Sequence, residues 1–229
     1  MVLTELPETR RALVKSYMEI MLLRDVVERN DLHSGYLAEK LLLKLLNSFT
    51  KEISVSKWFN DLKSEGINAS KDTLFKFLKL FEDTQFIHLL QNVAGGATSQ
   101  KKVYIADNGL FAPFRSLSPD NGRLFENLIF LDLKRIDSPL HFLKQQTGEC
   151  DFIIGKTAVQ SCYRLTSENW NREVVGLKLA LNYPGISRGL LVYNEIDLSA
   201  RLLASIPENC ELIDYFEFTT LPYLNNITL

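Results

Sequence analysis

Three polar side chains interrupt apolar segments in the second half of the chain, and their types suit the coordination of a hard metal ion. Asp151 lies in the strand-like segment Cys150–Ile154, and Gln160 lies in the next one, Ala158–Arg164. Glu126 lies upstream in a helix-like segment. Carboxylate and amide oxygens are ligands that Mg²⁺ accepts. The sequence therefore predicts that Glu126, Asp151 and Gln160 are the metal-side residues of a site.

The surroundings of Glu126 are unusual for a charged residue. Its neighbours at helical spacing are Ile129, Phe130 and Leu133, so it lies on an apolar helix face. A carboxylate on such a face needs a metal ion, a charged partner or a water-filled cleft. We expect Glu126 to face a cleft. The alternatives are an ion pair with Arg123 one turn earlier and a helix-start acid that the helix dipole favours.

A helix carboxylate, a strand Asp and an (E/Q)-x-K on the next strand form the PD-(D/E)XK nuclease pattern, and here Cys162 occupies the lysine position. In such nucleases the metal stabilises charge on the scissile phosphate, and the lysine positions or deprotonates the attacking water. A thiol carries no positive charge, and its usual pKa is about 8.5. Cys162 therefore fits best as a small buried strand residue, because a nucleophilic cysteine has no paired His nearby in the sequence.

A lysine could instead reach the site from another element. Lys144 on the preceding strand and Lys178 on the following helix are the two candidates, and the alternative for each is an ordinary surface lysine. Without such a replacement we expect cleavage to be weak or absent, while binding of metal or phosphate survives.

The elements around these residues alternate in a recognisable order. The periodicity predicts a helix over 123–136, strands over 141–145, 150–154 and 158–164, a helix over 168–182 and a strand over 189–193. Residues 212–221 add a strand-like piece and a short helix. The order αβββαβ is that of restriction-endonuclease-like folds, in which helices cover both faces of a mixed sheet.

The first half predicts helices followed by a hairpin. Residues 7–30 form one helix with the stripe Leu13, Tyr17, Ile20, Arg24 and Val27. Between residues 36 and 107, three helices precede a β-hairpin over 86–105. The second of them runs over 55–64 and stops at Gly66, and the third runs over 71–82 after the cap Ser70. Three helices with a hairpin after the third is the winged-helix arrangement, whose third helix can enter a major groove.

The residues expected to contact nucleic acid lie on that third helix and on the hairpin, or wing. They are Lys71, Phe75, Lys76, Lys79, Lys101 and Lys102. Five lysines would give a modest salt dependence of binding. Acidic neighbours offset them, so protein docking is the alternative role of this domain.

The fold class expected overall is α/β (α+β in the whole chain), with a helix over 1–34, a winged-helix domain over 35–112 and a nuclease-like domain over 113–229. The 229 residues carry a net charge of −2, which argues against strong, indiscriminate binding of polyanions. Three cysteines without a CxxC pair indicate a reducing cytoplasm. No phosphate-binding glycine motif, paired-His zinc motif, signal peptide or membrane-length apolar run occurs in the sequence.

Several segments together resemble a known prokaryotic family. The chain is similar to the domain of unknown function that follows an AAA-type P-loop ATPase module in many bacterial and archaeal proteins. The resemblance rests, in order, on residues 17–29, 70–83, 102–110, 122–127, 148–152 and 159–163. It implies a winged helix followed by a PD-(D/E)XK-like domain, with the ATPase module absent from this chain. ATP would then be bound only by that module, acting in cis or in trans.

Three functions remain open from the sequence. The first is a DNA-binding effector region of an AAA-type ATPase with a degenerate nuclease cleft, which is not an enzyme by itself. The second is an active Mg²⁺-dependent deoxyribonuclease. The third is a protein-interaction or oligomerisation module with a protein partner or a second copy, and no membrane partner is expected in any of the three.

Overall fold

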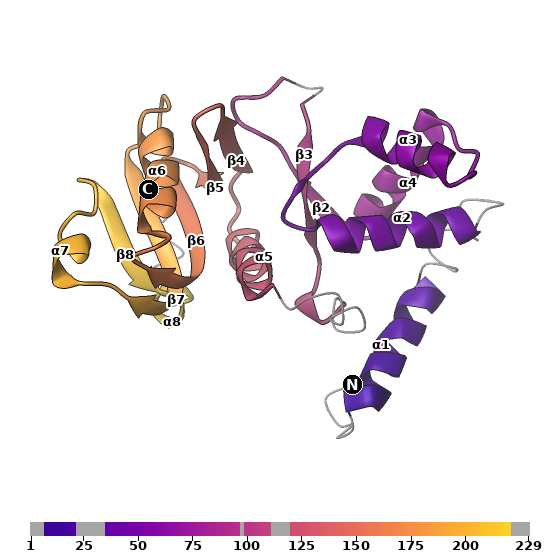
Figure 1. The fold of residues 1–229 in the computed structure, drawn as a ribbon, viewed down its shortest axis with the longest axis horizontal. Coiled ribbons are helices and arrows are strands. Elements are labelled where there is room, and N and C mark those ends of the chain that lie inside the picture. The colour runs from indigo at the N-terminus through magenta and orange to yellow at the C-terminus, as the bar shows by residue number, and fades with distance from the viewer. Residues whose placement is uncertain (1–6, 22–34, 97–98, 111–119, 221–229) are drawn as a thin grey trace. The chain divides into compact units, whose positions relative to one another are not determined.

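The structure, a computed structural model, describes residues 7–21, 35–96, 99–110 and 120–220. These residues form eight helices and two sheets, one of which is mixed, so the chain is an α/β protein (Figure 1). The chain divides into two compact units. The first comprises Met1–Leu89 and Gln100–Pro119, and the second comprises Leu90–Ser99 and Asp120–Leu229.

The first unit combines four helices with a small sheet. Its helices are α1 (Pro7–Met21), α2 (Gly35–Ser48), α3 (Val55–Ser64) and α4 (Lys71–Asp83). The strands β1 (Glu52–Ile53), β2 (Ile87–Leu90) and β3 (Lys101–Ile105) lie in the order β1-β3-β2, with β1 antiparallel to β3. The two-residue strand β1 was not predicted, because so short a segment carries no periodicity.

Local signals explain the limits of α3 and α4. Ser70 caps α4, its hydroxyl oxygen accepting a hydrogen bond from Thr73 N at 3.0 Å. Gly66 follows the end of α3 with φ of 75°, a left-handed conformation that glycine adopts without strain. The apolar face of α4, Leu74, Phe77, Leu78 and Phe81, is buried. The predictions for these two helices are confirmed.

The prediction for α1 was only partly right. The helix is described to Met21, and the rest of the predicted helix lies outside the described residues. Its buried side chains are Val14 and Met18. The predicted stripe is exposed where it is described, with Leu13, Tyr17 and Ile20 at 44%, 46% and 61%. Adjacent helix positions differ by about 100°, so a shift of one residue turns the buried face toward solvent.

The second unit is built on a five-stranded sheet of order β4-β5-β6-β7-β8. Its elements are α5 (Asn121–Leu133), β4 (Leu140–Gln145), β5 (Gly148–Ile154), β6 (Thr157–Thr166), α6 (Trp170–Leu181), β7 (Arg188–Asp197), α7 (Ala200–Leu203), β8 (Cys210–Asp214) and α8 (Tyr215–Phe218). Strands β4, β5 and β6 pair antiparallel, whereas β6, β7 and β8 pair parallel. The predicted αβββαβ order and mixed sheet are therefore present.

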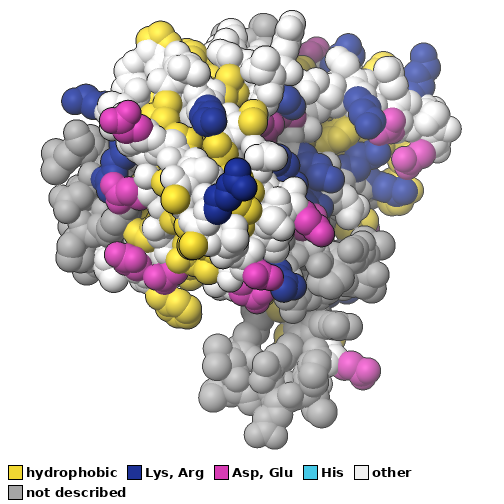
Figure 2. All heavy atoms as spheres, turned by 60° about the vertical axis from the view of Figure 1, so that its left-hand side comes forward, with side chains coloured by type: hydrophobic (Ala, Val, Ile, Leu, Met, Phe, Trp, Pro, Cys, Tyr) yellow, Lys and Arg dark blue, Asp and Glu magenta, His cyan; other side chains and the backbone are white. Residues whose placement is uncertain are grey.

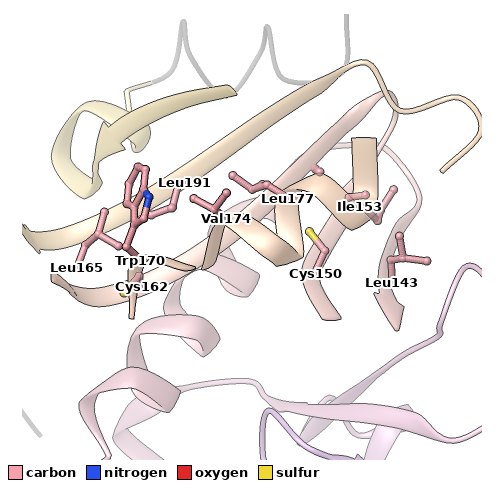
Figure 3. Packing of buried hydrophobic residues seen from close by; sticks show 11 residues of the cluster. Leu143, Cys150, Ile153, Cys162, Leu165, Trp170, Val174, Leu177 and Leu191 are labelled. Carbon is pink, nitrogen blue, oxygen red and sulfur yellow. The ribbon is translucent and has the colours of Figure 1, made fainter. Parts of the chain in front are cut away.

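Helices α5 and α6 pack on opposite faces of this sheet. Adjacent strand residues point to opposite faces. On β6, Tyr163 contacts the ring of Phe125 from α5, whereas Cys162 belongs to the apolar cluster that contains Trp170 and Val174 of α6 (Figure 3). The sheet is therefore covered on both sides, and β6 faces both helices.

The segment after β2 joins the second unit and not the first. Val93 N donates to Phe142 O at 2.8 Å, and Phe142 N donates to Gln91 O at 3.0 Å. The side chain of Asn92 accepts from Lys144 N at 3.1 Å and donates to Lys144 O at 2.9 Å. This part of the expected wing therefore lies along β4 at the edge of the large sheet.

Acidic and basic side chains both occur among apolar ones on the face drawn in Figure 2, in line with the small net charge. Within the described part of the chain, none of the helices has the length and apolar character needed to cross a membrane.

The packing of α6 on the sheet predicts that the same kind of substitution changes stability strongly at a buried position of α6 and weakly at an exposed one. Leu177 is fully buried in that core, whereas Val175 on the same helix is 45% exposed. Leu177→Ala should lower the free energy of unfolding by about 2–5 kcal/mol through reduced burial and a cavity. Val175→Ala is the matched control and should change it by no more than about 0.5 kcal/mol. Urea unfolding measures both; equal effects would contradict this packing.

Candidate functional site

One cleft of the second unit gathers the acidic residues that the sequence singled out. Its volume is about 670 Å³, and it is lined by the beginnings of α5 and α6 together with parts of β5 and β6. Glu126, Asp151, Gln160 and Cys162 all line it. Residues far apart in the chain thus meet where the two helices begin against β6.

The carboxylate of Asp151 is fastened to the neighbouring strand. Asp151 is buried, and its Oδ2 accepts hydrogen bonds from Ser161 N at 2.9 Å and from Ser161 Oγ at 2.8 Å. Two donors on one carboxylate oxygen fix the orientation of the side chain. Ser161 is therefore a positioning residue that the sequence reasoning missed.

Gln160 links both strands to helix α6. Its Nε2 donates to Glu173 Oε2 at 2.8 Å, and its Oε1 accepts from Asp151 N at 3.4 Å. Both ends of this buried amide are hydrogen-bonded, as a buried polar group requires. The bonds point the amide toward α6.

Glu173 and Arg172 are further cleft residues that were not predicted. Glu173 is 1% exposed, and its Oε1 accepts from the guanidinium of Arg172, with Nε at 2.9 Å. The pKa of Glu173 is raised, mainly by burial and also by the charge of Asp151. The hydrogen bonds from Arg172 and Gln160 oppose this shift. The signal was present in the sequence, because Glu173 shares an apolar helix face with Leu177, as Glu126 does with Phe130.

Cys162 is a neutral thiol in this setting. Burial, and then the charge of Glu173, raise its pKa to about 12. Asn169 Nδ2 lies 3.6 Å from Cys162 Sγ, and the side chain is 5% exposed. The prediction of a small buried strand residue is confirmed (Figure 3). Neither a thiolate nucleophile nor a positive charge is present at this position near neutral pH.

Neither candidate lysine stands in for the missing one. Lys144 Nζ lies 3.6 Å from Glu149 Oε2, at the rim of the cleft, and Lys144 is outside the set of lining residues. Lys178 is exposed in the last turn of α6. Burial raises the pKa of the nearby Cys210 to about 11, and the charge of Lys178 opposes this shift. Both fit the alternative of surface lysines.

Three arginines supply the positive charge of the cleft, namely Arg123, Arg164 and Arg172. Arg164 is paired with Glu195 at 3.8 Å and is 63% exposed, and the side chain of Arg172 is 76% exposed. Burial lowers the pKa of Arg123, against the charges of Asp120 and Glu126, which raise it. Guanidinium groups bind phosphate in bidentate fashion, but five acids line the same cleft, namely Asp120, Glu126, Glu149, Asp151 and Glu173.

The residues predicted to hold a metal, Glu126, Asp151 and Gln160, have suitable donor atoms and line one cleft. Within the described part of the chain, no group of three or more His, Cys, Asp or Glu side chains could hold a metal ion. Gln160 and Asp151 use oxygens for the bonds to Asp151 N and to Ser161. The metal role of these residues therefore stays a prediction, and we derive no step through a bound metal.

The expected nucleic-acid contacts of the first unit are mostly exposed. Lys71, Phe75, Lys76 and Lys79 lie on the outer face of α4. Lys71 Nζ donates to Ser56 Oγ at 3.0 Å. Lys101 is half-buried. Lys102 is only 2% exposed, which corrects the expectation that it could reach a phosphate, because the central strand β3 has neighbours on both sides.

Comparison with known proteins places the chain in a family. The family described as Domain of unknown function (DUF8612) matches residues 1–121, and the chain belongs to it. An uncharacterized protein of Methanocaldococcus jannaschii is 31% identical over 198 residues, which are 81% of this chain and 45% of that protein.

A second relative, an uncharacterized protein of Haemophilus influenzae, is 24% identical over 152 residues, which are 64% of this chain and 38% of that protein. The chain thus spans less than half the length of these curated relatives. No solved structure gives a significant match.

The buried carboxyl of Glu173 predicts a pH-dependent stability. Its pKa in the folded state is raised above the ordinary value of 4.5, so folding favours the protonated form. This stabilisation is present below about pH 4.5 and is lost as the pH rises through the folded pKa. Relative to Glu173→Gln, the free energy of unfolding of the native chain should therefore fall as the pH is raised above about 4.5.

Urea unfolding from about pH 4 to about pH 8 measures this difference. The exposed Glu168→Gln is the matched control and should run parallel to the native chain. A constant difference between the native chain and Glu173→Gln at every pH would contradict the assignment.

Proposed function

We propose that this chain is the C-terminal, non-ATPase region of an AAA-type ATPase family protein that binds DNA, with a nuclease-like second unit that cleaves weakly or not at all. The observation that carries the proposal is the cleft in which Glu126, Asp151 and Gln160 lie beside arginines while the lysine position holds Cys162. A pattern of that kind supports recognition of a phosphodiester without the group that positions water.

The proposed binding rests on the arginines. Arg164 and Arg172 have exposed guanidinium groups at the cleft, and residues from the first turns of α5 and α6 line it. Helix N-termini and arginines both favour a phosphate. The acids in the same cleft limit the affinity, so binding should be strongest at low salt.

The first unit supports the same proposal. The order α2-β1-α3-α4-β2-β3 with the sheet order β1-β3-β2 is compatible with a winged helix, and α4 carries Lys71, Lys76 and Lys79 on its exposed face. We propose α4 as the helix that enters the major groove. The partner ATPase, in cis or in trans, is proposed from the resemblance, and a cytoplasmic location is proposed from cysteines that form no disulfide.

The cleft arginines should dominate DNA binding by the second unit. Arg164→Gln and Arg172→Gln should each weaken binding of a fluorescent DNA at about 50 mM salt, and each should lower the salt slope by about 0.7–0.9 for every phosphate that the variant no longer neutralises. Fluorescence anisotropy at several salt concentrations measures both quantities. Arg201→Gln is the matched control, because Arg201 is exposed and lies outside the cleft lining.

Unfolding midpoints show whether each variant still folds, since Arg172 is paired with the buried Glu173. Unchanged affinity in folded Arg164→Gln and Arg172→Gln would remove the cleft from the proposal. An equally large decrease in Arg201→Gln would mean that only net charge matters.

Cleavage is the second test. Because Cys162 is neutral and no lysine replaces it in the cleft, plasmid incubated with the chain and Mg²⁺ or Mn²⁺ should stay uncut or nearly so. Gel electrophoresis over several hours measures this against the variant Asp151→Asn. Cleavage by the native chain that Asp151→Asn abolishes would instead establish an active nuclease. Cleavage that persists in Asp151→Asn would belong to a contaminant.

A further inference from the structure

A row of four aromatic rings runs from the cleft to the surface of the second unit. Tyr163 lines the cleft, and its ring centroid lies 6.0 Å from that of Phe125. Phe125 lies 5.6 Å from Tyr215, and Tyr215 lies 6.1 Å from Phe216. We call these four residues the aromatic row. Phe216, at its outer end, is 79% exposed.

Hydrogen bonds anchor the backbone and the neighbour of Phe216 at the outer end of the row. Tyr215 Oη donates to Asp132 Oδ2 of α5 at 3.0 Å, and burial together with this bond raises the pKa of Tyr215. Asp214 caps α8, accepting from Phe216 N at 2.9 Å and from Glu217 N at 3.1 Å. The backbone of Phe216 is thus fixed by the cap, while its exposed ring is accessible to a ligand.

The charges along the row differ at its two ends. The cleft that Tyr163 reaches carries both signs, with Arg123, Arg164 and Arg172 among five acidic side chains. At the other end, Asp214 and Glu217 flank Phe216. Carboxylates repel phosphates, so this end suits the uncharged part of a ligand whose phosphates lie in the cleft. A nucleobase has that character, and it stacks on an aromatic ring whatever its sequence.

We propose that the second unit takes single-stranded nucleic acid, with phosphates on the cleft arginines and a base stacked on Phe216. The inference rests on the proposed function and names its substrate class. The exposed ring of Phe216 can stack on an unstacked base, which a single strand exposes and a duplex keeps within its own stack.

The experiment compares three fluorescent probes by anisotropy at low salt. They are an oligothymidine of about 12 nucleotides, an abasic strand of the same length that lacks every base, and a duplex of the same length. This length lies within the range of known single-strand binding sites. Phe216→Ala should weaken binding of oligothymidine about 5-fold or more, since stacking contributes about 1–3 kcal/mol per base. It should leave the abasic chain and the duplex unchanged. Phe216→Trp should bind oligothymidine as the native chain does.

Leu203→Ala is the matched control, because Leu203 is also an exposed apolar residue of the second unit, at 38%, but lies on α7 and outside the cleft lining. Equal affinity of native chain and Phe216→Ala for oligothymidine would overturn the inference, as would an equal decrease with the abasic chain. If the duplex alone binds, and binding depends on Arg164 and Arg172, the proposed function stands and the inference falls. If none of the probes binds, both fall.

Discussion

The close approach of helix α6 to strands β5 and β6 is the constraint on which the cleft depends. A Cβ atom at Gly176 would lie 2.5 Å from Glu149 O and 2.8 Å from Gln160 Oε1, so only glycine permits this distance. The approach brings Glu173 within reach of the Gln160 amide. The buried carboxylate is then satisfied by an amide and a guanidinium, which a polar group in this position requires.

Strand β6 pairs antiparallel with β5 and parallel with β7, and this change of direction positions both the cleft and the aromatic row. The antiparallel strands β5 and β6 place Asp151 beside Ser161, and the parallel strands β7 and β8 carry the chain to α8. In a parallel sheet the carboxyl ends of the strands share one edge. Phe216 therefore reaches the same α5-covered face as Tyr163 through the contacts of Phe125 and Tyr215.

Prediction from the sequence succeeded where local chemistry decides. The hydroxyl of Ser70, the positive φ of Gly66 and the period of apolar residues on α4 act within a few residues of chain, and the structure has them as expected. Prediction failed for Lys102 and for the stripe on α1. Whether a strand is central, or which face of a helix is covered, depends on elements far away in the sequence.

The cleft residues that the sequence did not predict were missed for the same reason, because their contacts depend on elements far away in the sequence. Glu173 was detectable as an acid on an apolar face, but its hydrogen bond to Gln160 depends on how α6 docks. The aromatic row likewise joins α5, β6 and α8, and no spacing in the sequence connects them.

The sequence by itself determined the limits of α3 and α4, the αβββαβ order of the second unit and the identity of the polar residues that interrupt apolar segments. It did so because periodicity, caps and turns are local. Only the tertiary structure decided that arginines and not Lys144 or Lys178 bring positive charge to the cleft, and that Cys162 is a neutral thiol. Burial and the distance between charges set these properties, and both arise when separate elements pack together.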